Sequence, residues 1–345
     1  MNYLPVSPES LEKGAKILLN GGLVAFPTET VYGLGADAFN PRALAKVFEA
    51  KGRPHFDPLI VHIAAIETLE KAADLSQLSE KTRKRLFLLA ENLWPGPLSF
   101  VLPKNEKIPG IATAGLPTAA IRFPDHAAAQ KLISLSSGAV AAPSANPFGS
   151  LSPTRAEHVR DKLGIKVDLI LDGGSTRIGL ESTVMDITGE NIKILRPGGT
   201  PRESIEKLIG KVQHNEQYNE QEQSPLTSPG LLKSHYAPGT PLSVFTREDI
   251  IRQPYETGRA EIQQTAFVFF DVSTKDAWID AQNPPQSAVI RVLSKSGNAL
   301  EAASRLFETL HELDNSNATQ IFAQLAPQEG LGEAINDRLK KGSSR

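Results

Sequence analysis

The sequence contains no cysteine. Disulfides, thiolate zinc sites and cysteine nucleophiles are therefore excluded together, and the composition fits a reducing compartment. An excess of charge of one sign is also missing, because 37 basic residues face 39 acidic ones and the formal net charge is −2. This balance argues against a global basic field of the kind that non-specific nucleic-acid binders use, while a local basic cleft stays open.

Long apolar runs are absent as well. No stretch approaches the roughly 18 apolar residues of a membrane span, and the N-terminal residues MNYLP show neither a basic nor an apolar leader region. We therefore expect a soluble, cytoplasmic protein. The length of 345 residues, 40% of them hydrophobic, predicts two domains that each have enough apolar material for a core.

Several catalytic motifs are missing too. There is no H-E-x-x-H, and His55 and His62 are not spaced like a metal pair, which disfavours a zinc site. Ser144 stands in Pro-Ser-Ala-Asn rather than G-x-S-x-G, and no G-x-x-x-x-G-K-[ST] is present, so a hydrolase elbow and a P-loop are both disfavoured. Residues 33–38 fit G-x-G-x-x-A only loosely, so a nicotinamide enzyme is a weak alternative.

What the chain does contain is centred on residues 21–37, GGLVAFPTETVYGLGAD. Leu23 to Phe26 predicts a short buried strand that is entered through Gly-Gly. Pro27 ends this strand because it has no N–H for the ladder. The small and polar residues that follow, up to Gly33 and Gly35, predict a loop whose backbone and hydroxyls approach a small ligand, with an ordinary tight turn as the alternative.

Predicted strands and helices interleave over the first 210 residues, and several strands follow one another directly. This pattern favours an α/β domain with a twisted mixed sheet over a purely parallel one. Helices are expected to start at Ser7-Pro8 and Asn40-Pro41 and after Thr154 as a cap. The polar stretch 213–223 predicts a linker, and the strands and helices from 241 onward predict a small α/β domain.

Hydroxyl and cationic side chains gather at the predicted strand ends, where loops of α/β sheets commonly bind ligands. Few carboxylates accompany them, which favours a small anionic ligand such as a nucleotide phosphate or a carboxylate. Taken singly, a lone Arg or Lys also fits a surface charge, His62 fits a core histidine, and Thr118 and Ser144 fit caps. The residues concerned are Lys51, Arg53, His62, Thr118, Arg122, Ser144, Ser152, Thr154, Ser182 and Arg196.

A series of short motifs carries a resemblance. In chain order they are FPTETVYGLG (26–35), KxRP (51–54), PGP (95–97), RFP (122–124), PSAN (143–146), SPT (152–154), EST (181–183), RPG (196–198), SPG (228–230) and HYAP (235–238). Together they make the chain resemble the YrdC-like threonylcarbamoyl-adenylate synthases in their long, two-domain form. The resemblance implies a YrdC-like catalytic domain at 1–211, a linker or lid at 212–240 and a smaller C-terminal α/β (Rossmann-like) domain at 241–345.

The resemblance also implies a reaction. L-threonine, bicarbonate or CO2, and ATP with Mg²⁺ would give L-threonylcarbamoyl-AMP and pyrophosphate, and tRNA-modification machinery would use the adenylate to make threonylcarbamoyladenosine. The implied threonine-binding residues are Thr30, His62, Arg122, Ala142 (through its backbone) and Ser182. The implied ATP-binding residues are Arg53, Asp57, Thr118, Ser144, Ser152, Arg196 and Tyr236, with Lys51 and Arg53 as the catalytic pair near the phosphates.

Two departures from the family pattern accompany this reading. Asp57 stands where the family usually has Asn, so it could face a metal ion or the ribose instead of a phosphate; no residue is assigned to a metal site. Residues 231–234, LLKS, are less basic than the usual spacer before His-Tyr. We further expect the segment before Pro238 to fold over the first domain, with the ring of Tyr236 free to reach the nucleotide.

Two other classes of protein stay open. An RNA-binding module with a basic concave surface would bind duplex RNA in a salt-dependent manner without ATP. A carbamoyltransferase that uses carbamoyl phosphate would resemble the hydrogenase-maturation enzymes that contain a related domain. Those enzymes carry extra domains and zinc-finger cysteines, which this sequence lacks. Direct binding of tRNA stays an open question at this stage.

Overall fold

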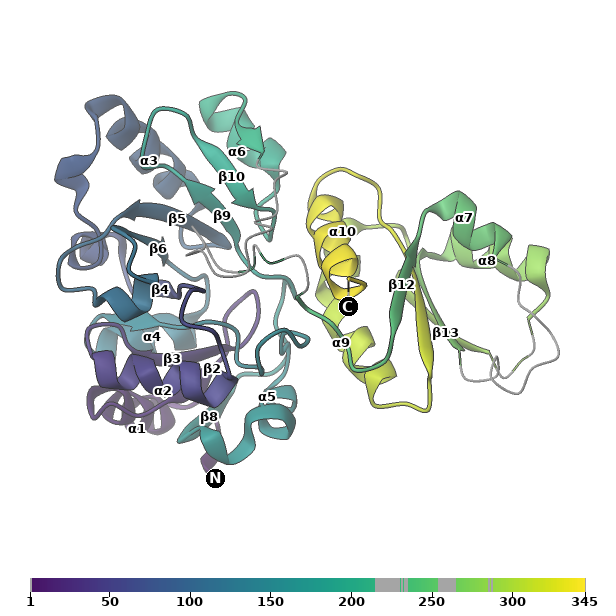
Figure 1. Ribbon diagram of the computed structural model, residues 1–345, viewed down its shortest axis with the longest axis horizontal. Coiled ribbons are helices and arrows are strands. Elements are labelled where there is room, and N and C mark those ends of the chain that lie inside the picture. Colours follow the sequence, from purple (N-terminus) through teal and green to yellow (C-terminus); the bar gives the residue numbers. More distant parts are fainter. Residues whose placement is uncertain are drawn as a thin grey trace. The chain divides into compact units, whose positions relative to one another are not determined.

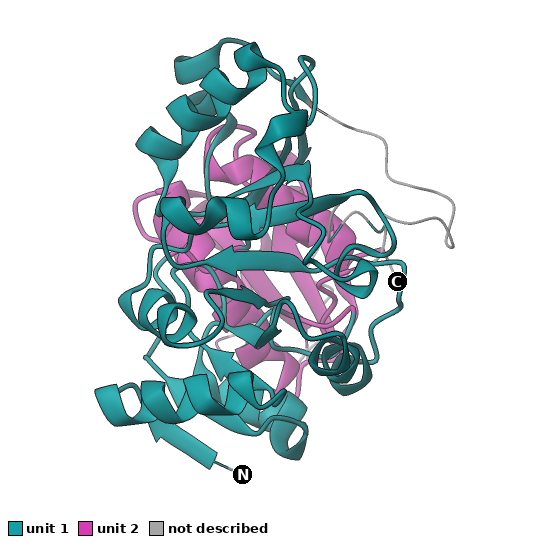
Figure 2. Cartoon of the chain, turned by 90° about the vertical axis from the view of Figure 1, so that its left-hand side faces the viewer, with its two compact units in different colours: residues 1–148, 152–177, 181–232 teal, residues 149–151, 178–180, 233–345 magenta. Residues whose placement is uncertain are grey.

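The computed structural model describes residues 2–214, 230, 232, 235–253, 265–284, 286 and 288–344. The chain forms two compact units, which Figure 2 shows in different colours. Unit 1 comprises residues 1–148, 152–177 and 181–232, and unit 2 comprises residues 149–151, 178–180 and 233–345. Unit 2 therefore takes in two short segments that the expected boundaries assign to the first domain. Most of the expected lid at 212–240 lies outside the described residues.

Unit 1 is built on one large sheet flanked by helices (Figure 1). Its strands are β1 (Asn2–Pro5), β2 (Val24–Phe26), β3 (Gly33–Asp37), β4 (Ile60–Ile63), β5 (Leu98–Pro103), β6 (Thr118–Arg122), β7 (Ala139–Ala141), β8 (Leu169–Asp172), β9 (Thr183–Asp186), β10 (Lys193–Arg196) and β11 (Gln213–His214). Its helices are α1 (Pro8–Leu19), α2 (Pro41–Lys51), α3 (Glu80–Leu93), α4 (Ala127–Leu135), α5 (Ala156–Leu163) and α6 (Arg202–Ile209). Short 3-10 helices are η1 (Ile66–Lys71), η2 (Leu75–Gln77), η3 (Gly110–Thr113) and η4 (Gly164–Lys166).

The described strands of unit 1 form a single sheet in the order β1-β8-β2-β3-β7-β4-β6-β5-β9-β10-β11. Neighbours run in both senses: β4 pairs with β6 in parallel, whereas β4 pairs with β7 and β5 pairs with β6 in antiparallel fashion. The expected mixed sheet is thus confirmed. Because β4, β6 and β5 are adjacent, residues far apart in the sequence are brought level with one another at the centre of the sheet.

The central stretch folds as a hairpin of β2 and β3, which pair in antiparallel fashion. Gly33 to Asp37 is therefore a strand and not part of the ligand loop, which shortens that loop to residues 27–32. Gly35 serves packing: a Cβ at this position would lie 2.8 Å from Cε1 of Phe26 and 2.9 Å from Cγ1 of Val140. The expectation that Gly35 lets the backbone approach a ligand is wrong, because side chains of the core fill that space.

Local signals set the ends of several helices. Asn40 caps α2 by accepting hydrogen bonds from the backbone N–H groups of Arg42 and Ala43, and Gly52, with φ 61°, ends this helix in the left-handed conformation. The expected cap at Thr154 is wrong, because α5 starts at Ala156. Thr154 instead belongs to the preceding loop, where its backbone N–H donates to Nδ1 of the His158 ring.

The two faces of the sheet are covered differently. On one face, α2, α3 and α6 pack over a large core that contains Val61 and Ile121. On the other face, α1 and α4 cover the half of the sheet around β8 and β2. The second half of that face holds a smaller apolar cluster, and none of its described members comes from a helix. The cluster consists of Ile60, Val101, Ala120, Val184 and Leu195, with Phe56 and Leu232 packed beside them.

Side-chain alternation places polar residues on this uncovered half. Successive side chains of a strand point to opposite faces, so His62 shares a face with Ile60, Arg122 with Ala120, and Ser99 with Val101. The sheet thus carries its polar strand residues on the face that the described helices leave to loops. This arrangement positions the candidate site.

Unit 2 contains a four-stranded parallel sheet in the order β12-β15-β13-β14. Its strands are β12 (Leu242–Phe245), β13 (Thr265–Asp271), β14 (Val289–Ser294) and β15 (Gln320–Gln324), and its helices are α7 (Arg247–Arg252), α8 (Val272–Gln282), α9 (Ala299–Asp314) and α10 (Leu331–Gly342). Strands and helices alternate, which confirms the expected small α/β domain; α7 and α8 were not predicted from the sequence. Buried Trp278 of α8 packs on Phe267 and Phe269 of β13.

The two short segments of unit 2 are held by its main part. The backbone N–H of Ala237 donates to the carbonyl oxygen of Gly149 at 2.9 Å. Gly179, with φ 74°, lies against α9 so closely that a Cβ there would be 2.7 Å from the carbonyl oxygen of Ala303 and from Cα of Ser304. Only glycine fits this position without moving the helix backbone.

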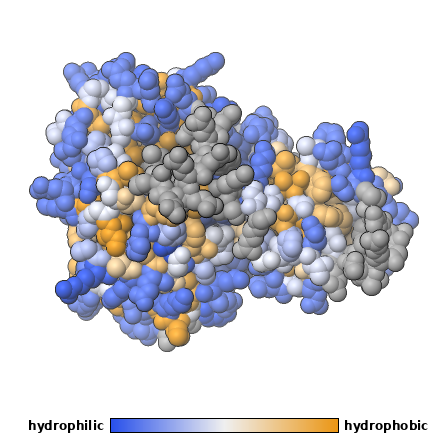
Figure 3. All heavy atoms as spheres, in the orientation of Figure 1, coloured by the Kyte–Doolittle hydropathy of each residue, from blue (hydrophilic) through white to orange (hydrophobic). Residues whose placement is uncertain are grey.

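Few large hydrophobic side chains of the described residues are exposed. On the face that Figure 3 shows, hydrophobic residues are interspersed among hydrophilic ones. The large hydrophobic residues that are exposed, Leu19, Leu88, Ile165 and Leu300, belong to α1, α3, η4 and α9 respectively. None of the described helices is long and apolar enough to cross a bilayer.

Candidate active site

The loop between β2 and β3 presents a buried polar cluster. The hydroxyl of Thr28 donates to the carbonyl oxygen of Val31 at 2.6 Å and accepts from the backbone N–H groups of Thr30 and Val31, so the loop closes as a tight hydroxyl-stabilised turn. The turn directs Glu29 and Thr30 toward Arg122. Nη1 of Arg122 donates to the Thr30 hydroxyl at 2.9 Å, and Nη2 lies 2.6 Å from Oε2 of Glu29.

Arg122 is the centre of the first group of predicted site residues. In the sheet, His62 of β4 is its partner on one side and Ser99 of β5 on the other. The hydroxyl of Ser99 is 2.8 Å from that of Ser182. The structure therefore brings together four of the five residues that are expected to bind threonine, namely Thr30, His62, Arg122 and Ser182.

His62 is uncharged in this environment. Burial, together with the positive charge of Arg122, lowers the pKa of His62 from its ordinary value of 6.5 to about 3. Its Nδ1 lies 3.2 Å from the carbonyl oxygen of Ile60. The fifth residue, Ala142, donates its backbone N–H to the same Ile60 carbonyl at 2.9 Å, so a backbone contact from Ala142 to a ligand has to use its carbonyl oxygen.

A second group surrounds Asp57. Nη2 of Arg53 lies 2.9 Å from Oδ2 of Asp57 and donates to the carbonyl oxygen of Pro58 at 2.7 Å. Burial raises the pKa of Asp57, and the charges of Arg53, Lys51 and Arg196 act against that rise. The carboxylate thus stands among three cations, which explains how it is tolerated near a proposed phosphate site: it neutralises Arg53.

Lys51 is buried in the same group. Its ammonium donates to the carbonyl oxygens of Ser144 and Asn146, both at 2.5 Å. Burial, with the charge of Arg53 adding to it, holds the pKa of Lys51 well below its usual range. The loop that carries Ser144 is fixed to the hairpin by two backbone hydrogen bonds of 2.8 Å, from Leu34 N–H to the Pro143 oxygen and from Ala145 N–H to the Tyr32 oxygen.

Arg196 connects the two groups. It acts on the charge of Asp57 and donates to the carbonyl oxygen of Ser182 at 2.7 Å. Next to it, the hydroxyl of Ser152 donates to Glu181. Residues 181 and 182 therefore lie between the group around Arg122 and the group around Asp57.

Thr118 and Tyr236 occupy different places. Thr118, at the start of β6, pairs with Pro103 of β5 and lies two residues before Ala120, the partner of Ile60. Tyr236 belongs to unit 2, where its buried ring lies 4.9 Å from Cζ of Arg338. Its ring is held there and not free as expected; contact between Tyr236 and a nucleotide stays a prediction.

Three polar residues of the site, Glu29, Ser99 and Glu181, were given no binding role from the sequence, although Glu29 and Glu181 lie within its motifs. All three are buried, and the two carboxylates each face a predicted site residue, Arg122 and Ser152. The site therefore contains more carboxylates than the sequence pattern predicted. The signal available for Ser99 is its position in the apolar strand Leu98 to Leu102, where a polar residue has to be satisfied from a neighbouring strand.

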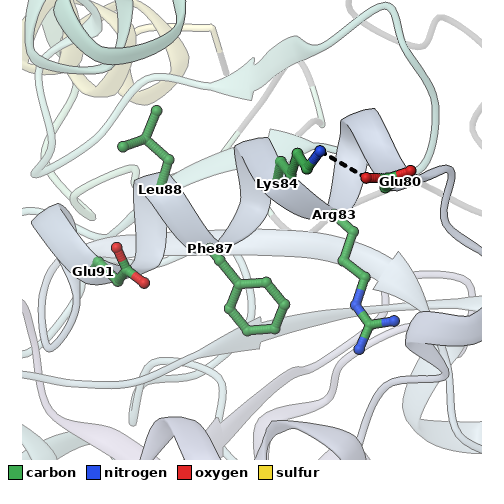
Figure 4. Close-up of a pocket in the computed structure, with 6 residues that line it drawn as sticks. All are labelled: Glu80, Arg83, Lys84, Phe87, Leu88 and Glu91. Atoms are coloured by element: carbon green, nitrogen blue, oxygen red, sulfur yellow. Dashed lines mark ion pairs between the residues drawn. The ribbon is translucent and has the colours of Figure 1, made fainter.

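Two other features carry no catalytic argument. No three His, Asp or Glu residues of the described part of the chain are grouped closely enough to hold a metal ion. A surface pocket of about 460 Å³ lies on α3, lined by Glu80, Arg83, Lys84, Phe87, Leu88 and Glu91 (Figure 4). Those lining residues come from one helix, with Lys84 paired to Glu80 at 2.6 Å, and include no residue of the two groups described above.

Comparisons with known proteins agree over both units. A family model described as telomere recombination (Sua5, YciO, YrdC) matches residues 16–198, and one described as threonylcarbamoyl-AMP synthase, C-terminal domain, matches residues 200–344. The chain is 41% identical to the threonylcarbamoyl-AMP synthase of Pyrococcus abyssi, over 95% of this chain and 92% of that protein. It is 37% identical to the Bacillus subtilis protein of the same name, over 99% of this chain and 94% of that protein. A crystal structure of P. abyssi Sua5 complexed with L-threonine is similar with a TM-score of 0.85 and 37% identity, covering 99% of this chain and 96% of that chain.

Proposed function

Because this chain belongs to the threonylcarbamoyl-AMP synthase family, we propose that it makes L-threonylcarbamoyl-AMP and pyrophosphate from L-threonine, bicarbonate or CO2, and ATP. The adenylate would then be used by tRNA-modification machinery to form threonylcarbamoyladenosine. The observation that carries the proposal is the pair of buried polar groups, one around Arg122 and one around Asp57, which Arg196 and Ser182 join. One group suits an amino acid and the other a polyphosphate.

The group around Arg122 supplies contacts for threonine. A guanidinium binds a carboxylate strongly, because its parallel N–H groups match the two oxygens. Nη1 of Arg122 is already turned to the Thr30 hydroxyl, at 2.9 Å. Neutral His62 and the hydroxyls of Thr30 and Ser182 are partners of the kind that the threonine side-chain hydroxyl requires.

The group around Asp57 supplies charge for the phosphates. Lys51, Arg53 and Arg196 outnumber the two carboxylates of this region, Asp57 and Glu181, so the region is net positive when all five groups are charged. In the reaction, the threonine ammonium loses its protons to water or bicarbonate as its nitrogen bonds to the carbon of CO2, which gives a carbamate. A carbamate oxygen then forms a bond to the α-phosphorus, and the bond from that phosphorus to pyrophosphate breaks. No covalent bond to the enzyme is needed, so the chemistry is compatible with the absence of cysteine; positioning and charge neutralisation supply the catalysis.

Magnesium is proposed to arrive as part of the ATP substrate, bound to phosphate oxygens. The described residues offer no cluster of three metal-ligating side chains, and Asp57 is already paired with Arg53. When bound, the ion neutralises charge on the departing pyrophosphate. The protein's own part is to hold the nucleotide with Arg53, Arg196 and the Ser152 region.

The test is to incubate the full chain with ATP, threonine and bicarbonate and to follow pyrophosphate and the adenylate by mass spectrometry. Pyrophosphate release is expected to need threonine and bicarbonate together, so leaving out either one is the control. Equal release with serine or alanine would contradict a threonine pocket built on Thr30, His62 and Ser182. Absence of product combined with salt-dependent binding of duplex RNA would favour the RNA-binding alternative.

A further inference from the structure

Glu29 has a buried carboxylate that the proposed chemistry does not yet use. Its side chain is 1% exposed, and Oε2 forms the 2.6 Å ion pair with Nη2 of Arg122. Its other oxygen, Oε1, is buried without a hydrogen-bond partner among the described residues. A buried charged oxygen that lacks a hydrogen bond is costly, and proteins retain such groups mainly where a ligand or a water completes them.

The charges around Glu29 form a simple pattern. His62 is neutral, and burial lowers the pKa of neighbouring His126. Arg122 and Glu29 are therefore left as one positive and one negative group side by side. An α-amino acid carries the same two charges, a carboxylate and an ammonium, on a single carbon atom.

The position of the pair is fixed by the backbone. The Thr28 turn sets the direction of Glu29, and β6 sets that of Arg122, whose Nε donates to the carbonyl oxygen of Gly96 at 3.2 Å. The two charges thus come from elements that are held independently of each other. Such preorganisation lets a site distinguish ligands by charge at little ordering cost.

We propose that Glu29 binds the α-ammonium group of threonine through Oε1 while Arg122 binds the carboxylate. The inference rests on the proposed function and adds to it the residue that selects an α-amino acid. A ligand with a hydroxyl in place of the amino group keeps the attraction to Arg122 but leaves Oε1 unpaired. Sites that hydrogen-bond a substrate group reject analogues that lack it, because the buried partner is left unsatisfied. Glu29 thereby also positions the nitrogen that forms the carbamate C–N bond once the ammonium has lost its proton to water or bicarbonate.

The alternative is that Glu29 only neutralises and supports Arg122. The two roles are distinguished by a cycle of two ligands and two proteins. Binding of L-threonine and of 2,3-dihydroxybutanoate, its analogue with a hydroxyl in place of the amino group, is measured by calorimetry for the wild-type full chain and for Glu29→Gln. We expect Glu29→Gln to weaken the binding of threonine by roughly 10- to 100-fold, which is the range for one charge-assisted hydrogen bond. The affinity for the analogue should remain nearly unchanged.

Two further variants sharpen the cycle. Glu29→Asp keeps the charge and is expected to retain part of the preference for threonine. Asp37→Asn makes the same carboxylate-to-amide change at the end of the same hairpin, where the Asp37 side chain accepts from the Phe39 N–H and the Ser137 hydroxyl. It is expected to leave the preference intact.

Equal weakening of both ligands by Glu29→Gln would overturn the inference, since it would show that Glu29 acts only through Arg122. If Glu29→Gln shows no cooperative unfolding transition, the wild-type chain and Glu29→Asp decide together. Binding of the analogue to the wild-type chain as tightly as threonine overturns the inference, and a preference for threonine that Glu29→Asp reduces supports it. A wild-type chain that binds no threonine would overturn the proposed function itself. That outcome is distinct from threonine binding without a preference for the amino group.

Discussion

Replacement of Gly179 by alanine should destabilise unit 2 more than the same change at Gly297. The two glycines have nearly equal backbone angles, φ 74° and 76°. A methyl group at Gly179 would lie 2.7 Å from backbone atoms of Ala303 and Ser304, whereas one at Gly297 has no neighbour closer than 3.9 Å. The positive φ costs an alanine about 1–2 kcal/mol at either site, and forcing a methyl group into filled space costs about 1–3 kcal/mol more. We therefore expect Gly297→Ala to cost roughly 1–2 and Gly179→Ala roughly 2–5 kcal/mol of unfolding free energy.

The chain provides its own reporter for this measurement. Of its two tryptophans, Trp94 lies in unit 1 and Trp278 in unit 2. In a Trp94→Phe background, the fluorescence of Trp278 follows the unfolding of unit 2 in a denaturant titration. Trp278 is buried, and its ring centroid lies 4.4 Å from that of Phe267. Equal shifts of the unfolding midpoint for Gly179→Ala and Gly297→Ala would refute the reasoning. They would mean that the backbone of α9 moves to accommodate the methyl group without a loss of unfolding free energy.

Arg122→Ala is expected to reduce the binding free energy of threonine by roughly 2–5 kcal/mol and to affect ATP binding less. The reason is that the change removes the group that binds the threonine carboxylate and leaves Glu29 buried without its counter-ion. Calorimetry of both ligands checks this, and an unchanged threonine Kd with lost ATP binding would assign Arg122 to the other ligand. His62 predicts a pH effect on stability: its pKa is about 3 when folded, below its ordinary 6.5, so the unfolded chain takes up the proton first. Stability should therefore fall as the pH drops from 6.5 toward 3, by up to about 1.4 kcal/mol per unit, and His62→Asn should flatten the slope of unfolding free energy against pH; an unchanged slope would contradict this assignment.

Features set by neighbouring residues were predictable from the sequence. The cap at Asn40 and the strand that ends at Pro27 both depend on short-range rules, and both are confirmed. The order of motifs predicted the family, which the matches over both units confirm. Interleaved strands and helices likewise predicted the mixed sheet.

Features that depend on distant partners were not predictable. Glu29 and Arg122 are 93 positions apart, and only the sheet order β2-β3-β7-β4-β6 brings their elements together. Gly35 was assigned to a ligand loop because the sequence does not reveal that the Phe26 ring fills the space beside it. Ser99 and Ser182 meet only because β5 and β9 are neighbours, and strand order cannot be deduced from a local pattern.

The division of unit 2 along the chain also sets an order of events during translation. The segments 149–151 and 178–180 leave the ribosome long before α9, which packs on Gly179, and before Ala237, which binds Gly149. At about 5–20 residues per second, the delay between residue 180 and the end of α9 is on the order of 10 seconds. During that interval the sheet of unit 1 can assemble while the loops next to Ser152 and Glu181 still lack their final neighbours. A nascent chain can therefore form its scaffold before the segments 149–151 and 178–180 meet Ala237 and α9.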